Sequence, residues 1–94
     1  MKRGTVYRNP YVSIPTYYIY DRTMPQRGRE AQHTKGYEFT EIDDGKWEFR
    51  KAEYYKDSLP DFEIVGNIGN PDAIIEQALK AEIFALIDRG DQDV

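Results

Sequence analysis

The chain has 94 residues and a formal net charge of −4, with 13 Lys and Arg against 17 Asp and Glu. It has no cysteine, which excludes disulfides, thiolate metal sites and a cysteine nucleophile. The longest apolar run, Ile83 to Ile87, is too short to span a bilayer, and no apolar run follows the basic N-terminus as in a signal peptide. We therefore expect one cytoplasmic domain, 1–94, with no membrane contact.

The first expected strand lies in residues 11–20, which are rich in Tyr and Ile. Pro15 cannot donate to a ladder, so this segment is either an edge strand or a strand that starts after Pro15. Residues 21–36 contain Pro25, Gly28 and Gly36 and no hydrophobic period. We expect them to form a long basic loop.

Residues 37–55 predict a β-hairpin with its turn at Asp43-Asp44-Gly45. A two-residue loop would set two glutamates opposite each other, which is repulsive. A three-residue loop avoids this and gathers the aromatic side chains on one face, so it is the loop we expect. The pairs that it creates include Phe39 with Phe49 and Glu38 with Arg50.

The C-terminal third predicts a short strand at 62–66 and a helix at 71–89. Asn70 can cap the helix and Pro71 suits its first position. Apolar residues then recur at helical spacing until Gly90, and an acidic tail, 91–94, is expected to fray. The predicted fold class is α+β, with an antiparallel sheet of three to four strands packed by one C-terminal helix.

The charge is unevenly distributed, and this asymmetry points to a binding surface. Residues 1–36 hold seven bases and two acids, a net charge of +5, whereas residues 37–94 hold six bases and fifteen acids, a net charge of −9. Adjacent Tyr17 and Tyr18 cannot both point inward from a regular strand, so we expect one of them to be exposed beside the basic loop. Tyr and Arg are typical of interface hot spots. The candidate partner-binding residues are Tyr17, Tyr18, Tyr20, Arg22, Arg27, Arg29, His33 and Lys35.

The predicted helix carries more apolar surface than one stripe requires. Phe84 lies well off the main apolar face of this helix, and Ile87 lies at the flank of that face. Either Phe84 packs under the N-terminal segment, or Phe84 and Ile87 belong to a homodimer interface. No catalytic, cofactor-binding or metal-ligating motif is recognisable, and the single histidine, His33, has only Glu30 nearby.

Four functions remain open, one of which is a structural subunit of a larger assembly. The first is a small non-enzymatic interaction module, of an accessory, regulatory or inhibitor type, that binds a protein partner through its Tyr/Arg-rich surface. The alternative is a nucleic-acid-binding domain, in which arginines of the 21–36 loop contact phosphates and tyrosines stack on bases. The net acidity argues against a general nucleic-acid coat. An enzyme that uses Glu30 or His33 as acid or base is the least favoured.

Overall fold

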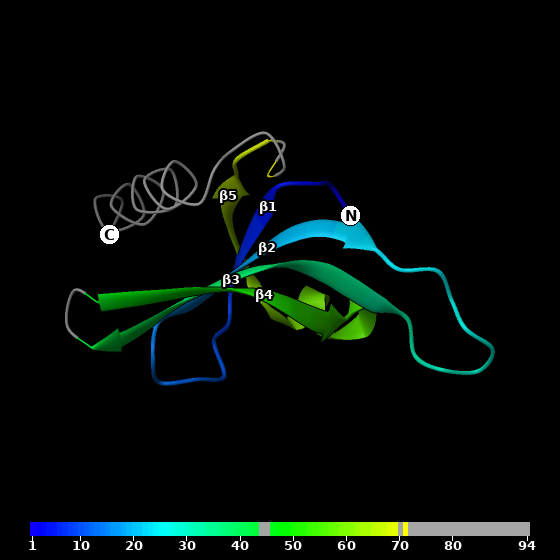
Figure 1. The fold of residues 1–94 in the computed structure, drawn as a ribbon, viewed down its shortest axis with the longest axis horizontal. Coiled ribbons are helices and arrows are strands. Elements are labelled where there is room, and N and C mark those ends of the chain that lie inside the picture. The colour runs from blue at the N-terminus through cyan, green and yellow to red at the C-terminus, as the bar shows by residue number, and fades with distance from the viewer. Residues whose placement is uncertain (44–45, 70, 72–94) are drawn as a thin grey trace.

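The computed structural model describes residues 1–43, 46–69 and 71. They form one antiparallel sheet with the strand order β4-β3-β2-β1-β5 (Figure 1). Neighbours in the sheet follow one another along the chain except at the end, where β5 returns to pair with β1. The elements are β1 (Thr5–Arg8), β2 (Thr16–Thr23), β3 (His33–Asp43), β4 (Lys46–Tyr55), the short 3₁₀ helix η1 (Lys56–Asp61) and β5 (Glu63–Asn67).

The α+β prediction is wrong. The described residues have a mostly β fold with five strands, and η1 is the only helical element among them. The extra strand is β1, whose four residues carry little local signal and are held by pairing with β2 on one side and β5 on the other. The expected helix at 71–89, beyond Pro71, and the tail at 91–94 lie outside the described residues.

Strand β2 is the centre of the sheet. It begins at Thr16, directly after Pro15, which confirms the second of the two interpretations of this segment. The segment that forms the expected strand at 62–66 is β5, shifted by one residue. The basic loop is shorter than expected, because β2 extends to Thr23 and β3 starts at His33, so the loop spans residues 24–32.

The hairpin of β3 and β4 has the predicted register along most of its length. Phe39 pairs with Phe49 and Glu38 with Arg50. Near the turn the prediction of a three-residue loop is wrong, because Asp43 pairs with Lys46 and the register shifts between Glu41 and Asp43. The additional residue is therefore taken up as a bulge within β3, and tip residues 44–45 lie outside the described residues.

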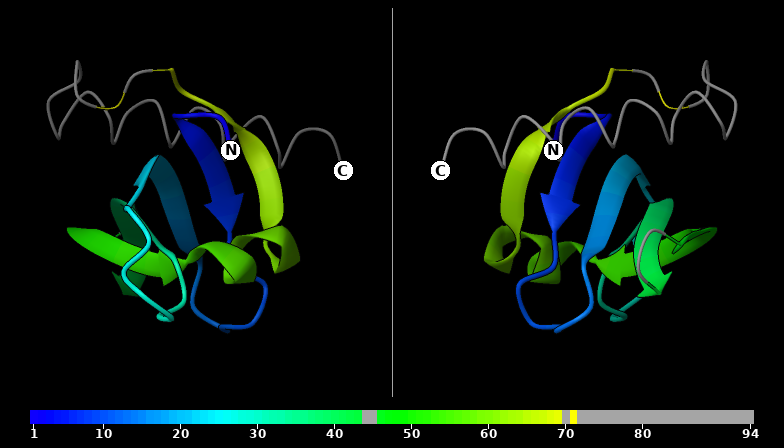
Figure 2. Two further views of the ribbon diagram at one scale, coloured as in Figure 1. Left: turned by 90° about the vertical axis from the view of Figure 1, so that its right-hand side faces the viewer. Right: turned by 90° about the vertical axis from the view of Figure 1, so that its left-hand side faces the viewer.

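Both faces of the sheet carry a hydrophobic cluster. One contains Val6, Tyr17, Ile19 and Phe39, and the other contains Tyr7, Tyr18, Tyr20 and Leu59 of η1. The side views in Figure 2 show β5 beside β1, with η1 near the lower end of these strands. A sheet with apolar clusters on both faces buries consecutive residues of its central strand, which a one-sided sheet cannot do.

Candidate functional site

The three candidate tyrosines are core residues. Tyr17, Tyr18 and Tyr20 are 6%, 1% and 6% exposed, so the expectation that one of the adjacent pair is exposed is wrong. The Tyr18 hydroxyl lies 3.0 Å from Thr34 Oγ1, and the Tyr20 hydroxyl lies 2.6 Å from Thr23 Oγ1. Burial raises the pKa of Tyr18 to about 12. These rings fill the sheet, and their hydroxyls are satisfied within it.

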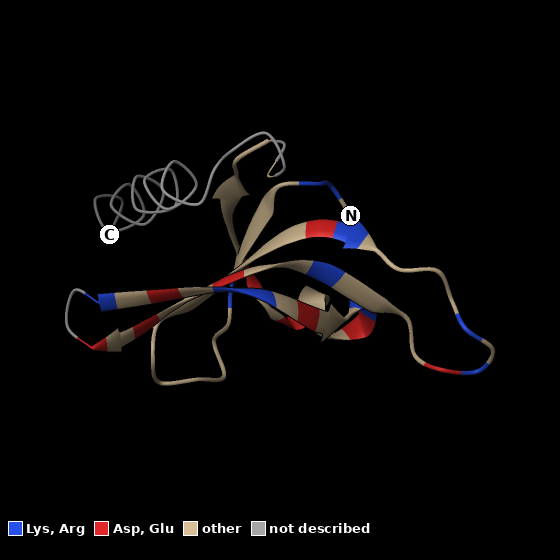
Figure 3. Ribbon diagram, in the orientation of Figure 1, with Lys and Arg blue, Asp and Glu red and all other residues tan. Residues whose placement is uncertain are grey.

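The candidate cations, by contrast, lie at the surface around one end of the sheet. Arg22 is exposed near the end of β2, and Arg27 and Arg29 are exposed on loop 24–32. In Figure 3 this loop projects from the body of the sheet and carries Lys or Arg segments. His33 and Lys35 follow at the start of β3, where both are partly buried. The structure therefore brings the five basic candidates to one region and separates them from the tyrosines.

A bulge in β2 places two cations directly opposite each other. The register between β2 and β3 shifts between Tyr20 and Arg22, and Arg22 then pairs with Lys35. Like charges in this position repel and destabilise a sheet. The bulged residue, Asp21, binds Arg3 Nε at 2.7 Å, and Glu53 Oε1 lies 3.7 Å from Lys35 Nζ. Part of the repulsion at Lys35 is thus offset, whereas Arg22 has no ionic partner among the described residues.

Gly36 is needed next to this bulge. Its backbone lies against β2 so closely that a Cβ would be 1.9 Å from the Ile19 carbonyl oxygen and 3.0 Å from the Tyr18 ring. Any other residue would push the two strands apart. The glycine therefore lets the bulged end of β2 stay in contact with β3.

Two shallow hollows adjoin the cation pair. One, of about 620 Å³, is lined by Arg22, Lys35 and Lys51, and the other, of about 520 Å³, by Arg27, His33 and Lys35. They share Lys35 and Glu53, so we treat them as one surface, the basic hollow. Its acidic residues are Asp21, Glu30 and Glu53. Two of these three carboxylates are already ion-paired, with Arg3 and Lys35 respectively.

Loop 24–32 is held in place by its own hydrogen bonds. The Met24 N–H donates to the His33 carbonyl at 2.8 Å, and Gln32 Nε2 donates to the Met24 carbonyl at 2.9 Å. At the tip, the Glu30 N–H donates to the Arg27 carbonyl at 3.1 Å, which closes a turn around Gly28. The two tip arginines are thus presented on a defined turn. Arg27 lines the basic hollow, and Arg29 belongs to the same turn.

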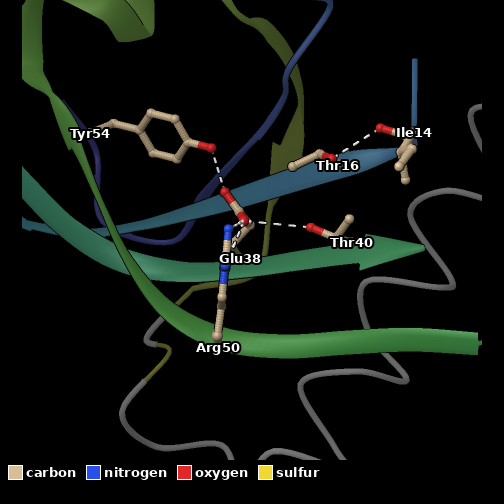
Figure 4. Close-up of polar contacts among 6 residues, drawn as sticks. All are labelled: Ile14, Thr16, Glu38, Thr40, Arg50 and Tyr54. Carbon is tan, nitrogen blue, oxygen red and sulfur yellow. Dashed lines mark hydrogen bonds and ion pairs between the residues drawn. The ribbon is translucent and has the colours of Figure 1, made fainter. Parts of the chain in front are cut away.

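A second polar cluster lies on the opposite face and is saturated. The buried Glu38 carboxylate accepts hydrogen bonds from Arg50, from Thr40 Oγ1 at 3.5 Å and from the Tyr54 hydroxyl (Figure 4). Burial, and then the hydrogen bond to Glu38, raise the pKa of Tyr54 to about 12. Three of these hydrogen bonds reach Oε1 and one reaches Oε2, so the buried carboxylate is held by groups of its own chain. The sequence predicted that Glu38 lies opposite Arg50, but not that the Glu38 carboxylate is buried.

The remaining candidates offer no catalytic arrangement. Within residues 1–43, 46–69 and 71, no three His, Cys, Asp or Glu side chains come together as metal ligands. The His33 ring lies edge-on against Tyr55, with centroids 4.7 Å apart. Phe84 and Ile87 lie outside the described residues. No helix in the described part of the chain is long and apolar enough to cross a membrane.

Comparison with known proteins finds no matching family model, curated protein or solved structure.

Proposed function

We propose that the protein is a small non-catalytic interaction module whose basic hollow binds an acidic segment of a partner protein. The observation that carries this proposal is the pairing of Arg22 with Lys35 across two strands, next to Arg27. These two cations repel each other, and an anion bound between them would relieve the repulsion. The site therefore complements a segment that carries several carboxylates.

The side chains of the basic hollow are able to bind carboxylates directly. Arginine presents a planar fork of donors that matches a carboxylate in a two-pronged hydrogen bond. Arg22 and Arg27 have no ionic partner among the described residues, and their guanidinium groups can turn toward a ligand. Because the hollow is shallow and open to solvent, each contact contributes modestly, about 0.2–1 kcal/mol.

A protein partner suits this surface better than a nucleic acid. Binding of unpaired bases relies on exposed aromatic rings, and Tyr17, Tyr18 and Tyr20 are buried in the sheet. The exposed ring beside these cations is Tyr55, which is already in contact with His33.

The test is a fluorescence anisotropy titration with a labelled peptide of alternating Glu and Ser, at low and at high salt. We expect saturable binding that weakens with salt, and a loss of about tenfold in affinity for the double variant Arg22→Gln/Arg27→Gln. The matched control is Arg8→Gln, because Arg8 is an exposed arginine that pairs with Tyr17 at the other end of β2.

Four outcomes would contradict the proposal. The peptide could fail to bind at low salt, or it could bind the double variant as well as the natural chain. A labelled single-stranded DNA or RNA that binds at concentrations where the peptide does not would favour the nucleic-acid alternative. Equal losses in Arg8→Gln and in the double variant would show only a general charge effect.

A further inference from the structure

Strand β4 is one edge of the sheet, and half of its backbone groups face away from β3. The Lys56 N–H donates to the Gln32 carbonyl at 2.9 Å, which fixes the alternation of the ladder. Residues 54, 52 and 50 therefore bond to β3, whereas the N–H and C=O groups of residues 55, 53, 51 and 49 point outward. Nothing in the described part of the chain pairs with this outer side. A row of unpaired groups of this kind is a template for another strand.

The side chains along this edge are self-complementary. We propose that a second copy of this chain pairs with β4, antiparallel, about a two-fold axis at Ala52. In this register Lys51 lies opposite Glu53 of the second copy, and Glu53 lies opposite Lys51 of the second copy. Phe49 lies opposite Tyr55 of the second copy, again twice. The small Ala52 faces its own copy at the axis, where a large side chain would clash.

Charge selects this register over its neighbours. Moving the axis to Lys51 sets two lysines opposite each other, and moving it to Glu53 sets two glutamates opposite each other. An axis at Arg50 opposes two arginines. An axis at Phe49 pairs Glu48 with Arg50, but Arg50 already binds Glu38 with its Nε and Nη2. The register at Ala52 instead uses Lys51, which has no ion pair among the described residues, and Glu53, whose only ion pair there is the 3.7 Å contact with Lys35.

The exposure of Tyr55 and Phe49 is consistent with pairing of β4 with a second copy of the chain. Tyr55 is 53% exposed, a large aromatic surface for an edge residue, and the paired strand would cover it. Phe49 is stacked on Tyr37 with ring centroids 5.6 Å apart and is only partly buried. Glu53 would lie between Lys35 of its own chain and Lys51 of the second copy, so the two basic hollows would meet at the axis.

The pairing is tested by sedimentation velocity over a range of protein concentrations, with two charge-reversal variants. In the natural chain we expect a dimer at high concentration. Lys51→Glu alone opposes two glutamates and Glu53→Lys alone opposes two lysines, so each weakens the dimer about tenfold or more. When the two variants are mixed, each contact is again between opposite charges, and the dimer mass returns. Circular dichroism checks that each variant is folded.

Hydrogen exchange of the natural chain gives an independent test that needs no variant. At high concentration we expect slow exchange at the amides of 49, 51, 53 and 55, and on dilution these four become fast while 50, 52 and 54 stay slow. A monomer at every concentration, a dimer that both variants leave unchanged, or variants that do not recover on mixing would each overturn the proposal. This inference does not rest on peptide binding at the basic hollow, and either result can stand without the other.

Discussion

The guanidinium of Arg50 holds the carboxylate of Glu38 through two hydrogen bonds to the same oxygen, Oε1, at 3.0 Å from Nε and 2.6 Å from Nη2. The Glu38 side chain is 4% exposed, whereas that of Arg50 is 63% exposed. The carboxylate is thus removed from water while its counter-ion remains hydrated. This arrangement reduces the desolvation penalty of a buried charge, because only one partner of the ion pair leaves the solvent.

The first prediction concerns the loss of this counter-ion. Arg50→Gln leaves the buried carboxylate with only Thr40 and Tyr54 as donors, so we expect the free energy of unfolding to fall by about 1–3 kcal/mol. Urea denaturation measures this change. Lys56→Gln removes the same charge from an exposed site and is expected to change the stability by less than about 0.5 kcal/mol. Equal stabilities for the natural chain and Arg50→Gln would mean that water replaces the guanidinium without loss.

The second prediction concerns alkaline pH. The pKa values of Tyr18 and Tyr54 are raised to about 12, chiefly by burial, from an ordinary value of 10.0. Above pH 10 the unfolded chain releases these protons and the folded chain keeps them. The contribution of these two tyrosines to the free energy of unfolding is therefore fully present below pH 10 and is lost as the pH rises from 10 to about 12.

Thermal melts at a series of pH values between 9 and 12 test this dependence. Tyr18→Phe removes one of these ionisable groups, so its melting temperature is expected to fall less steeply with pH than that of the natural chain. Tyr11→Phe is the control, because the Tyr11 ring is exposed. A slope that is identical in all three proteins would refute the assignment to buried tyrosines.

The third prediction concerns the close contact of β2 and β3. Gly36→Ala places a methyl group 1.9 Å from the Ile19 carbonyl oxygen, and we expect a loss of at least about 1–3 kcal/mol in unfolding free energy. Gly28→Ala is the comparison, because a Cβ there has no atom within 4 Å and the cost, about 1 kcal/mol, comes only from its positive φ. Chemical denaturation of both variants should rank Gly36→Ala as the less stable, and the reverse order would contradict the structure.

Local patterns predicted those parts of the fold that depend on neighbouring residues. The cross-strand match of Phe39 with Phe49 and of Glu38 with Arg50 identified the register of the hairpin, because opposite residues must be compatible whatever surrounds them. The rule that proline cannot donate within a ladder located the start of β2 at Thr16. The bulge at Asp21 has no such pattern, and without it Arg22 would not lie opposite Lys35.

By itself, the sequence determined the uneven distribution of charge, the hairpin and its register away from the turn, since these follow from residue type and spacing. Only the tertiary structure decided which of the Tyr and Arg residues remain at the surface. Tyr17 and Tyr18 point to opposite faces of β2, and both are buried because each face carries its own hydrophobic cluster. Those clusters include residues of β4, η1 and β5, which lie far from β2 in the chain. Burial depends on such distant contacts, and a local pattern does not contain them.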